Sequence, residues 1–315
     1  MNKKKIAVLG AGTMGPGIVT TYIMHGYEVS LYSRSQATLE QAKGVIASNL
    51  ELLAAEDTEA LAARVSYTTQ VAEAVRDAWY IVETIVEKAE AKIALYTQLD
   101  EILPPEVIIA SNTSALNIFE LMPQRRQPYT VISHWFAPAH ILPLVEVVRG
   151  PETLDSVMDQ TEQLHKNCGK TTVRMERFIP GFIINRLQGA LSREFYHLVE
   201  NGYCTAEDMD LAVKTSLMPR GMLLGVMQRM DFAGLDMCVN ALNNNRKKVP
   251  PEFPERPSVL YDPVDRGDLG VKTGKGIYDY SHKPYEQVLR ERDEQLLRSV
   301  KLAQEFMENP LHKQN

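Results

Sequence analysis

Residues 5–15 run Lys5-Ile6-Ala7-Val8-Leu9-Gly10-Ala11-Gly12-Thr13-Met14-Gly15, and they carry the most specific structural signal in the chain. A short apolar run predicts a buried strand, and the glycines follow it with the spacing Gly-x-Gly-x-x-Gly, directly before a helical stretch. In this context Gly10 permits a tight turn, Gly12 lets a bound pyrophosphate approach the backbone, and Gly15 lets helix and strand pack closely. Thr13 and Met14 lie in the same turn. We therefore expect a dinucleotide site at the helix N-terminus, where free N–H groups favour anions; the alternative is a glycine-rich turn without a ligand.

Further apolar runs continue the alternation of strands and helices as far as residue 180. They fall at residues 28–32, 79–82, 107–110, 130–133 and 144–148. This pattern predicts an α/β fold with an N-terminal Rossmann-like, doubly wound and mostly parallel sheet. Beyond Pro180-Gly181, helix-spaced leucines dominate residues 182–201 and 285–308, and residues 249–254 form an extended proline-rich connection. The prediction is a dinucleotide-binding Rossmann domain over residues 1–180 and an all-α substrate and dimerisation domain over residues 181–315.

Composition places the chain among ordinary globular proteins and argues against several classes of function. Apolar residues make up 44% of the 315 residues, the net charge is -6, and no basic block occurs, so nucleic acid is not an expected partner. No apolar run has the roughly 18 residues that a membrane span needs, and the basic start leads into a strand, so we expect a cytoplasmic protein that binds a small molecule. The three cysteines, Cys168, Cys204 and Cys238, lack the spacing of a metal site or a disulfide framework, so we expect no metal.

The residues after the second predicted strand bear on the choice of dinucleotide. An acid is expected there when the adenosine ribose belongs to NAD, about 20 residues beyond the glycines. The chain instead has Tyr32-Ser33-Arg34-Ser35. A guanidinium flanked by hydroxyls suits a 2′-phosphate, so Ser33 and Arg34 favour NADP over NAD as the cofactor. The alternative is that Arg34 stacks on the adenine or faces solvent, and the cofactor is NAD.

Several further motifs follow one another along the chain. They are Ser111-Asn112-Thr113-Ser114, His134-Trp135-Phe136-Ala137-Pro138, Leu144-Val145-Glu146-Val147-Val148, Pro180-Gly181-Phe182-Ile183-Ile184-Asn185-Arg186 and Lys272-Thr273-Gly274-Lys275-Gly276-Ile277-Tyr278. In order and nearly in spacing, these segments resemble the 3-hydroxyacyl-CoA dehydrogenase family, and the resemblance covers residues 4–280. It implies a nicotinamide-dependent oxidoreductase that interconverts a secondary alcohol and a ketone.

The resemblance also implies roles for individual residues. His134 is then the general acid/base and Glu146 its carboxylate partner, while Ser114 and Asn185 hold the substrate oxygen. This chemistry is reasonable in itself, because an imidazole titrates near neutral pH and a buried carboxylate orients the ring and stabilises imidazolium. The plainer alternatives are a structural histidine, a turn hydroxyl at Ser114 and a helix-capping Asn185. Further residues fall where the family contacts its dinucleotide: Thr84, Glu87, Lys92, Asn112 and Lys272.

The chain departs from the family pattern at three places. Ala137 stands where the family has asparagine. The region from Thr38 to Arg64, where family members that act on coenzyme A esters are basic, holds five acids against two bases. Net repulsion there disfavours a polyanionic coenzyme A handle. Arg220 is a cation in a turn that is usually uncharged in the family. We therefore expect a small anionic substrate without coenzyme A, bound by Arg220 or Arg186. The alternatives are a 3-hydroxyacyl-CoA substrate and an Arg220 that pairs with Glu207 or Asp208.

An apolar helix face in the second predicted domain bears on assembly. Its residues are Phe182, Ile183, Leu187, Leu191, Phe195 and Leu198. The face is consistent with subunit pairing, and the family resemblance implies a homodimer through this domain. A competing hypothesis from another class is a non-catalytic dinucleotide-binding protein, which would have no use for an acid/base pair beside the nicotinamide.

Overall fold

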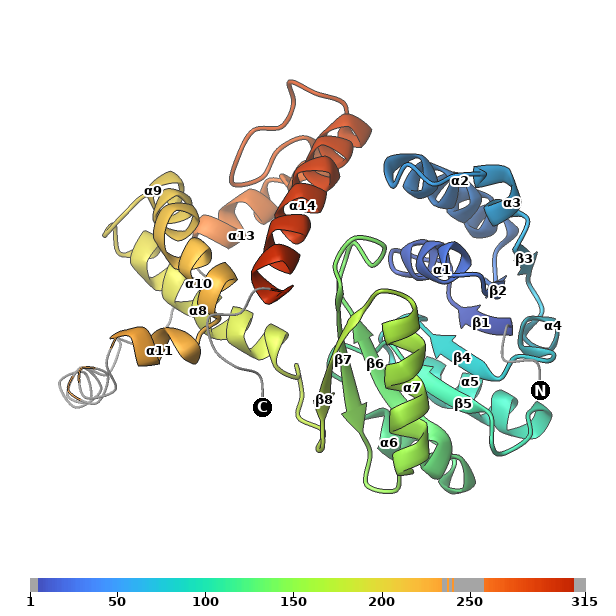
Figure 1. The fold of residues 1–315 in the computed structure, drawn as a ribbon. Coiled ribbons are helices and arrows are strands. Elements are labelled where there is room, and N and C mark those ends of the chain that lie inside the picture. Colours follow the sequence, from blue (N-terminus) through green and yellow to red (C-terminus); the bar gives the residue numbers. More distant parts are fainter. Residues whose placement is uncertain (1–4, 234–236, 238–239, 241–257, 309–315) are drawn as a thin grey trace. The chain divides into compact units, whose positions relative to one another are not determined.

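The computed structural model describes residues 5–233, 237, 240 and 258–308 (Figure 1). The chain divides into two compact units, Met1–Arg186 and Leu187–Asn315. The proline-rich connection expected at residues 249–254 and Cys238 lie outside the described residues. The domain boundary after residue 180 stays a prediction, because a division by contacts does not show which segment folds on its own.

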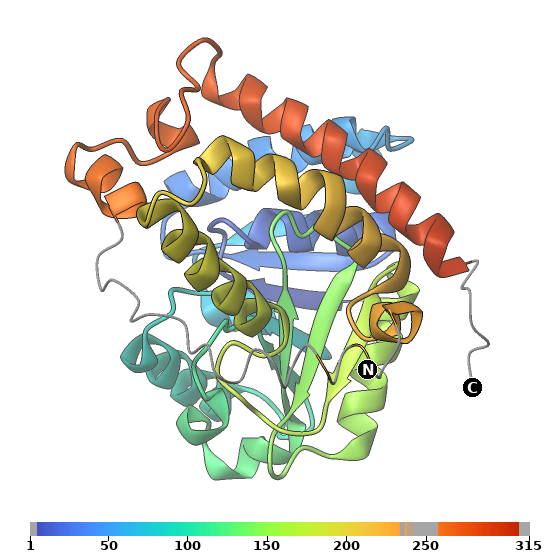
Figure 2. The ribbon, with the colours of Figure 1, turned by 90° about the vertical axis from the view of Figure 1, so that its left-hand side faces the viewer.

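An eight-stranded sheet forms the centre of the first unit, in the order β3-β2-β1-β4-β5-β6-β7-β8. The strands are β1 (Lys5–Leu9), β2 (Glu28–Tyr32), β3 (Val65–Thr68), β4 (Tyr80–Glu83), β5 (Ile108–Ser111), β6 (Thr130–Trp135), β7 (Leu144–Arg149) and β8 (Thr171–Met175). All neighbours pair in parallel except β6 and β7, which are antiparallel. Figure 2 shows the twist of the sheet, with the blue strands lying across the view and the green strands running nearly upright.

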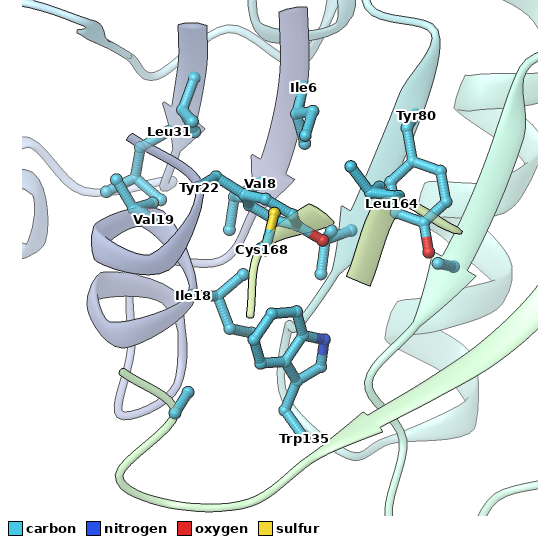
Figure 3. Close-up of a cluster of buried hydrophobic side chains, with 14 of the residues drawn as sticks. Ile6, Val8, Ile18, Val19, Tyr22, Leu31, Tyr80, Trp135, Leu164 and Cys168 are labelled. Atoms are coloured by element: carbon cyan, nitrogen blue, oxygen red, sulfur yellow. The ribbon is translucent and has the colours of Figure 1, made fainter. Parts of the chain in front are cut away.

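Helices cover both faces of this sheet. They are α1 (Gly15–Met24), α2 (Gln36–Leu52), α3 (Thr58–Ala62), α4 (Val71–Val75), α5 (Ala89–Ile102), α6 (Ile118–Leu121) and α7 (Asp155–Asn167). Alternate residues of β1 serve the two faces: Ile6 and Val8 pack with α1, α2 and α7, whereas Ala7 and Leu9 pack with α4, α5 and α6. Figure 3 shows part of the first cluster, with Ile18, Val19 and Tyr22 of α1 against Val8. The predicted doubly wound fold is confirmed.

The second unit is built of helices over the part that the structure describes. They are α8 (Ile184–Glu200, which begins in the first unit), α9 (Ala206–Ala212), a π-helical turn (Val213–Leu217), α10 (Met218–Leu224), α11 (Gln228–Ala233), α13 (Ser258–Asp265) and α14 (Tyr285–Glu308). The hydroxyl of Thr205 and the carboxylate of Asp208 form a capping box that starts α9. None of the described helices is both long and apolar enough to cross a membrane.

One residue of the predicted apolar helix face is placed elsewhere. Phe182 is only 1% exposed and belongs to the core of the first unit, so its assignment to a subunit-pairing face is wrong. The reason is local, because Phe182 precedes α8 and its ring packs on His134, with 5.0 Å between the ring centroids. Ile183, Leu187 and Leu191 remain exposed, as such a face requires.

Candidate active site

The glycine turn after β1 has the geometry that its spacing predicts. Gly10 has φ of 125°, and a Cβ there would lie 2.4 Å from the carbonyl oxygen of Thr84. A Cβ on Gly15 would lie 2.0 Å from the carbonyl oxygen of Gly10. A Cβ on Gly12 would meet no atom within 4 Å, so the protein's own packing does not demand glycine at this position. Open space at Gly12 is what the close approach of a ligand to the backbone requires.

The first amide groups of α1 are available to a ligand. Met14 occupies the N-cap position of α1 and makes no side-chain hydrogen bond to these amides. A helix N-terminus without a side-chain cap presents N–H donors and a partial positive charge. The turn therefore fits the pyrophosphate of a dinucleotide.

A cavity of about 710 Å³ opens over this turn. Its lining combines the glycine turn (Gly10 to Met14), the end of β2 (Tyr32, Ser33, Arg34), the segment after β4 (Thr84 to Glu87), one side of α5 (Ala91, Ala94, Leu95, Gln98) and Asn112, Ser114 and Trp135. This volume lies within the range of about 300–1,000 Å³ that is usual for ligand pockets. The predicted contact residues Thr84, Glu87, Asn112 and Ser114 therefore lie around one cavity.

The end of β2 carries hydroxyls and a guanidinium toward the adenosine side of such a site. Ser33 and Arg34 line the cavity, and Ser35 caps α2 by accepting a hydrogen bond from the amide of Thr38. Within the described residues Arg34 is exposed and no ion pair joins it to an acid. The guanidinium thus remains available for a ligand.

Glu87 organises the loop that carries Ser114. One carboxylate oxygen accepts hydrogen bonds from the hydroxyl of Thr113 and the amides of Ser114 (2.9 Å) and Ala115 (3.2 Å). Burial alone would raise the pKa of Glu87, but Thr113, Lys92 and these amides outweigh burial and lower the pKa below its ordinary value. Glu87 is therefore ionised at neutral pH and holds this loop in place.

A group of polar side chains that hydrogen-bond to one another lies beneath the cavity wall. Glu83, buried at the end of β4, accepts hydrogen bonds from Lys92 (2.7 Å), Tyr96 (2.7 Å) and Ser111 (2.6 Å). We call these four residues the Glu83 cluster. Lys92 has no exposed surface and also lies 3.3 Å from Glu87. Lys92 thus lies behind the wall, where it supports Glu87.

His134 and Glu146 meet across the antiparallel strands β6 and β7. They are direct partners in the ladder, and the Nδ1 of His134 lies 2.8 Å from Oε2 of Glu146. The other oxygen of Glu146 accepts hydrogen bonds from the amides of Ile183 and Ile184, at 3.0 Å each. Both side chains are buried, and Phe136 packs edge-on against the imidazole. We call these two residues the His134 pair.

One ring nitrogen of His134, Nε2, has no hydrogen-bond partner among the described residues. Over the part of the chain that the structure describes, the ring hydrogen-bonds through Nδ1 alone. Anchoring of Nδ1 by a carboxylate leaves Nε2 for proton exchange, which is the arrangement that general acid/base catalysis needs.

Asn112 ties the His134 strand to the cavity. Its Oδ1 accepts a hydrogen bond from the amide of Trp135 (2.8 Å), and its Nδ2 donates to the hydroxyl of Thr84 (3.2 Å). Asn185 is exposed and follows Ile184, whose amide binds Glu146. The structure therefore brings His134, Glu146, Asn112 and Asn185 into one part of the first unit.

Two predicted residues belong to the second unit. Lys272 lies in a single 3-10 turn (Val271–Thr273). Arg220, in α10, donates from Nε to the carbonyl of Ser216 and from a terminal nitrogen to its hydroxyl, both at 3.0 Å. The guanidinium therefore bonds to its own helical segment, whereas the expected alternative partner Asp208 caps α9.

The Glu83 cluster is not predicted by any motif in the sequence. A signal was present, because Glu83 ends the otherwise apolar run of β4, and a buried acid needs partners. Which side chains supply them depends on contacts between segments distant in sequence.

The glycine turn, the cavity and the His134 pair define a class of protein, a nicotinamide-dependent oxidoreductase. Comparison with known proteins is specific. Residues 5–178 match the model of the 3-hydroxyacyl-CoA dehydrogenase NAD binding domain, and residues 181–280 match that of the C-terminal domain of the same enzymes. The chain belongs to the 3-hydroxyacyl-CoA dehydrogenase family.

Individual relatives differ in substrate. The chain is 29% identical over 304 residues to 5-formyl-3-hydroxy-2-methylpyridine 4-carboxylate 5-dehydrogenase of Mesorhizobium japonicum, covering 93% of this chain and 96% of that one. It is 32% identical over 288 residues to a probable 3-hydroxyacyl-CoA dehydrogenase of Caenorhabditis elegans, covering 87% and 92%. A crystal structure of 5-formyl-3-hydroxy-2-methylpyridine 4-carboxylic acid 5-dehydrogenase, an NAD+ dependent dismutase, superposes with a TM-score of 0.85 at 26% identity and covers 96% of this chain and 98% of that one.

Proposed function

We propose that this chain is an NAD(P)-dependent dehydrogenase that interconverts a secondary alcohol and a ketone in a small anionic substrate without coenzyme A. The His134 pair carries the proposal: a buried imidazole is anchored at Nδ1, 2.8 Å from a carboxylate, and bonded at no other atom within the described residues. During oxidation Nε2 of His134 takes the hydroxyl proton, and Glu146 stabilises the imidazolium that forms. The nicotinamide, when bound, supplies the hydride acceptor.

The remaining groups hold the substrate. Ser114 lines the cavity on the loop that Glu87 fixes, and Asn185 follows the segment bound to Glu146. We assign both to the substrate oxygen, where fixed donors lower the cost of charge development. Glycines 10, 12 and 15 with Thr13, Met14, Thr84, Glu87 and Asn112 are assigned to the dinucleotide, Lys92 to the support of Glu87, and Lys272 to the dinucleotide by resemblance alone.

A substrate without coenzyme A is supported by charge and by one relative. Of the two bases between Thr38 and Arg64, Lys43 pairs with Glu40 (2.8 Å) and Arg64 donates to the carbonyl of Gly26. The two bases therefore do little to offset the repulsion between the five acids of this region and a polyanion such as coenzyme A. The pyridine carboxylate dehydrogenase of Mesorhizobium japonicum aligns with nearly the whole chain, and its name describes a small ring-borne carboxylate. We assign the substrate carboxylate to Arg220 or Arg186.

The test of catalysis is substitution of His134. His134→Ala is expected to lower kcat by about 10³-fold and to leave dinucleotide affinity within about twofold. His282→Ala, at an exposed histidine, is the matched control and should leave kcat unchanged. Turnover of His134→Ala at the wild-type rate would refute the acid/base assignment, and dinucleotide binding without any turnover by the wild type would favour a non-catalytic binding protein.

The substrate class is tested by turnover of small hydroxy acids and of 3-hydroxybutyryl-CoA. We expect small carboxylates to be used and Arg220→Gln to raise their KM about tenfold, with Arg290→Gln on α14 as the control. Rapid use of the thioester would instead support the alternative, a 3-hydroxyacyl-CoA dehydrogenase of fatty-acid metabolism; the family name itself describes only the dehydrogenase activity.

We propose NADP(H) as the preferred cofactor, because Ser33 and Arg34 line the cavity where an acid would select NAD. Arg34→Gln is expected to lower kcat/KM for NADP+ about tenfold, with the NAD+ reaction as the internal control. A wild type that prefers NAD+ and does not respond to Arg34→Gln would contradict this choice.

We also propose a homodimer through the second unit. Leu187 and Leu191 on α8, together with Ile183 just before this helix, expose between 37% and 47% of their surface, which is unusual for large apolar side chains so close together. Sedimentation equilibrium of Leu187→Glu against the wild type tests this assembly, and a monomeric wild type would contradict it.

A further inference from the structure

The connection between β6 and β7, residues 136–143, joins the strand that carries His134 to the strand that carries Glu146. Two turn-like hydrogen bonds order it, from the amides of Ile141 and Leu142 to the carbonyl of Pro138, at 3.0 Å each. The position of this connection bears directly on the position of the His134 pair.

A buried lysine holds the connection from one side. Lys170, directly before β8, is 7% exposed and donates from Nζ to the carbonyls of Ala139 (2.6 Å) and Leu142 (2.9 Å). Its ammonium also lies 5.2 Å from the ring centroid of Trp135, the residue after His134. Burial lowers the pKa of Lys170 to about 8, while Cys168 acts in the opposite direction, so the group is still mainly charged at neutral pH.

The partners of this lysine are unusual. Buried ammonium groups are normally paired with acids, yet no ion pair to Lys170 occurs within residues 5–233 and 258–308. The carbonyl oxygens of Ala139 and Leu142 therefore take the place of water around the ammonium group. Displacement of residues 139–142 would leave a buried cation without acceptors, which ties the connection firmly to Lys170.

The dinucleotide helix α1 holds the connection from the other side. A Cβ on Gly17 would lie 3.2 Å from Cβ of Ala139 and 3.3 Å from the amide nitrogen of His140, so backbone and connection are in direct contact. The hydroxyl of Thr21 also donates to the carbonyl of Ala139, at 3.4 Å. Figure 3 shows Ile18 and Tyr22 of α1 gathered with Trp135 and Cys168 in one buried cluster.

We propose that residues 136–143 form a clamp that fixes the position of the His134 pair relative to the dinucleotide helix α1, with Lys170 as its positioning residue. The inference rests on the proposed function for its catalytic consequence. Lys170 is assigned no contact with the substrate or with the His134 pair, and it acts through residues 136–143. Because α1 begins at the glycine turn, the clamp sets the distance between the acid/base group and the bound cofactor.

Lys170→Met tests the clamp, since it keeps an unbranched chain and removes the charge and its donors. The expected result is a fall in kcat of at least about tenfold, with the KM for the dinucleotide within about threefold of the wild type. Amide hydrogen exchange at Ile141 and Leu142 should become at least about tenfold faster. The matched control is Lys166→Met, on the exposed surface of α7, which should leave kcat and exchange unchanged.

A second variant approaches the clamp from α1 and does not remove a buried charge. Gly17→Ala is expected to press on Ala139 and lower kcat several-fold. Gly44→Ala is its control, because a Cβ there meets no atom within 4 Å and alanine favours the helix.

Three outcomes are decisive. Wild-type exchange at Ile141 and Leu142 in Lys170→Met would overturn the clamp, as would a loss of kcat that merely follows loss of dinucleotide binding. A wild-type protein without dehydrogenase turnover would contradict the proposed function instead, and faster exchange in Lys170→Met would then still support the structural clamp.

Discussion

The Glu83 cluster and the His134 pair each contain a buried carboxylate with a basic partner. They differ in whether the basic partner keeps an atom that is open for hydrogen bonding. Lys92 and Glu83 satisfy each other, with Tyr96 and Ser111 completing the set. In the His134 pair the carboxylate is equally satisfied, by the imidazole and two backbone amides, but Nε2 of the ring stays unbonded among the described residues. Burial and pairing are all that a structural group needs, and the open Nε2 of His134 is the feature on which the proposed acid/base role depends.

Removing the ammonium of the Glu83 cluster should give the largest effect. Lys92→Met leaves the buried carboxylate of Glu83 without its counter-ion, so the free energy of unfolding is expected to fall by about 3–5 kcal/mol. Urea denaturation measures this, with the exposed Lys88→Met as the control. A loss below about 1 kcal/mol would show that Lys92 is not a structural partner, and the contrast between the two sites would fail.

Changing the carboxylate of the His134 pair should act on rate more than on stability. Glu146→Gln keeps the shape but presents a neutral amide to Nδ1, so we expect kcat to fall by about 10²-fold, with unchanged dinucleotide affinity measured by fluorescence titration. If instead kcat were unchanged and only the melting temperature fell, both sites would be structural.

A second buried histidine sharpens the comparison, because among the described residues no carboxylate pairs with His165. Burial, with a smaller effect of Lys170, lowers the pKa of His165 to about 3, and its Nε2 lies 3.1 Å from the hydroxyl of Ser133. The unfolded chain binds this proton below about pH 6.5 and the folded chain does not, so the stabilisation is present above that pH and lost as pH falls toward 3.

His165→Gln removes this titration and keeps a polar group for Ser133. From pH 7 to pH 5 the wild type is expected to lose about 2 kcal/mol more stability than the variant, measured by denaturation at each pH. Equal losses in the two proteins would mean that the ring is protonated in the fold.

The smallest expected effect concerns the loop of Ser114. Thr113→Val removes one of the donors to Glu87 and leaves the amides of Ser114 and Ala115 in place. We expect the free energy of unfolding to fall by about 1–2 kcal/mol, less than for Lys92→Met. Thermal denaturation measures the change, with Thr97→Val on the surface of α5 as the control. A fall in the free energy of unfolding as large as that of Lys92→Met would show that Glu87 and the Glu83 cluster stabilise the fold as one unit.

Much of the fold could be predicted from local patterns. The strand, glycine turn and helix at the start are confirmed, and the long helix predicted over residues 285–308 is present as α14. Two strands were missed, β3 and β8, and both lie at the edges of the sheet. Edge strands pair on one side only and are partly exposed here, so they need no continuous apolar run.

The candidate site divides in the same way. The glycines, Asn112, Ser114, His134 and Glu146 could be named from motifs and resemblance, and the structure brings these residues of the first unit together. Glu83 and Lys170 could not, because their significance comes from partners that lie 9 to 31 positions away. The burial of Lys92 and Phe182 likewise depends on packing that no spacing records.

Short-range periodicity and motif order in the amino-acid sequence were enough to predict the class of fold and the dinucleotide turn, and the family resemblance implied that Glu146 is the partner of His134. Three features became visible only in the folded chain: His134 faces Glu146 across an antiparallel strand pair, Lys92 lies behind the cavity wall, and Lys170 holds the connection beside the dinucleotide helix. The physical reason is that a buried charge must find its partner wherever the chain brings one, and the sheet's long-range pairing determines which segments meet.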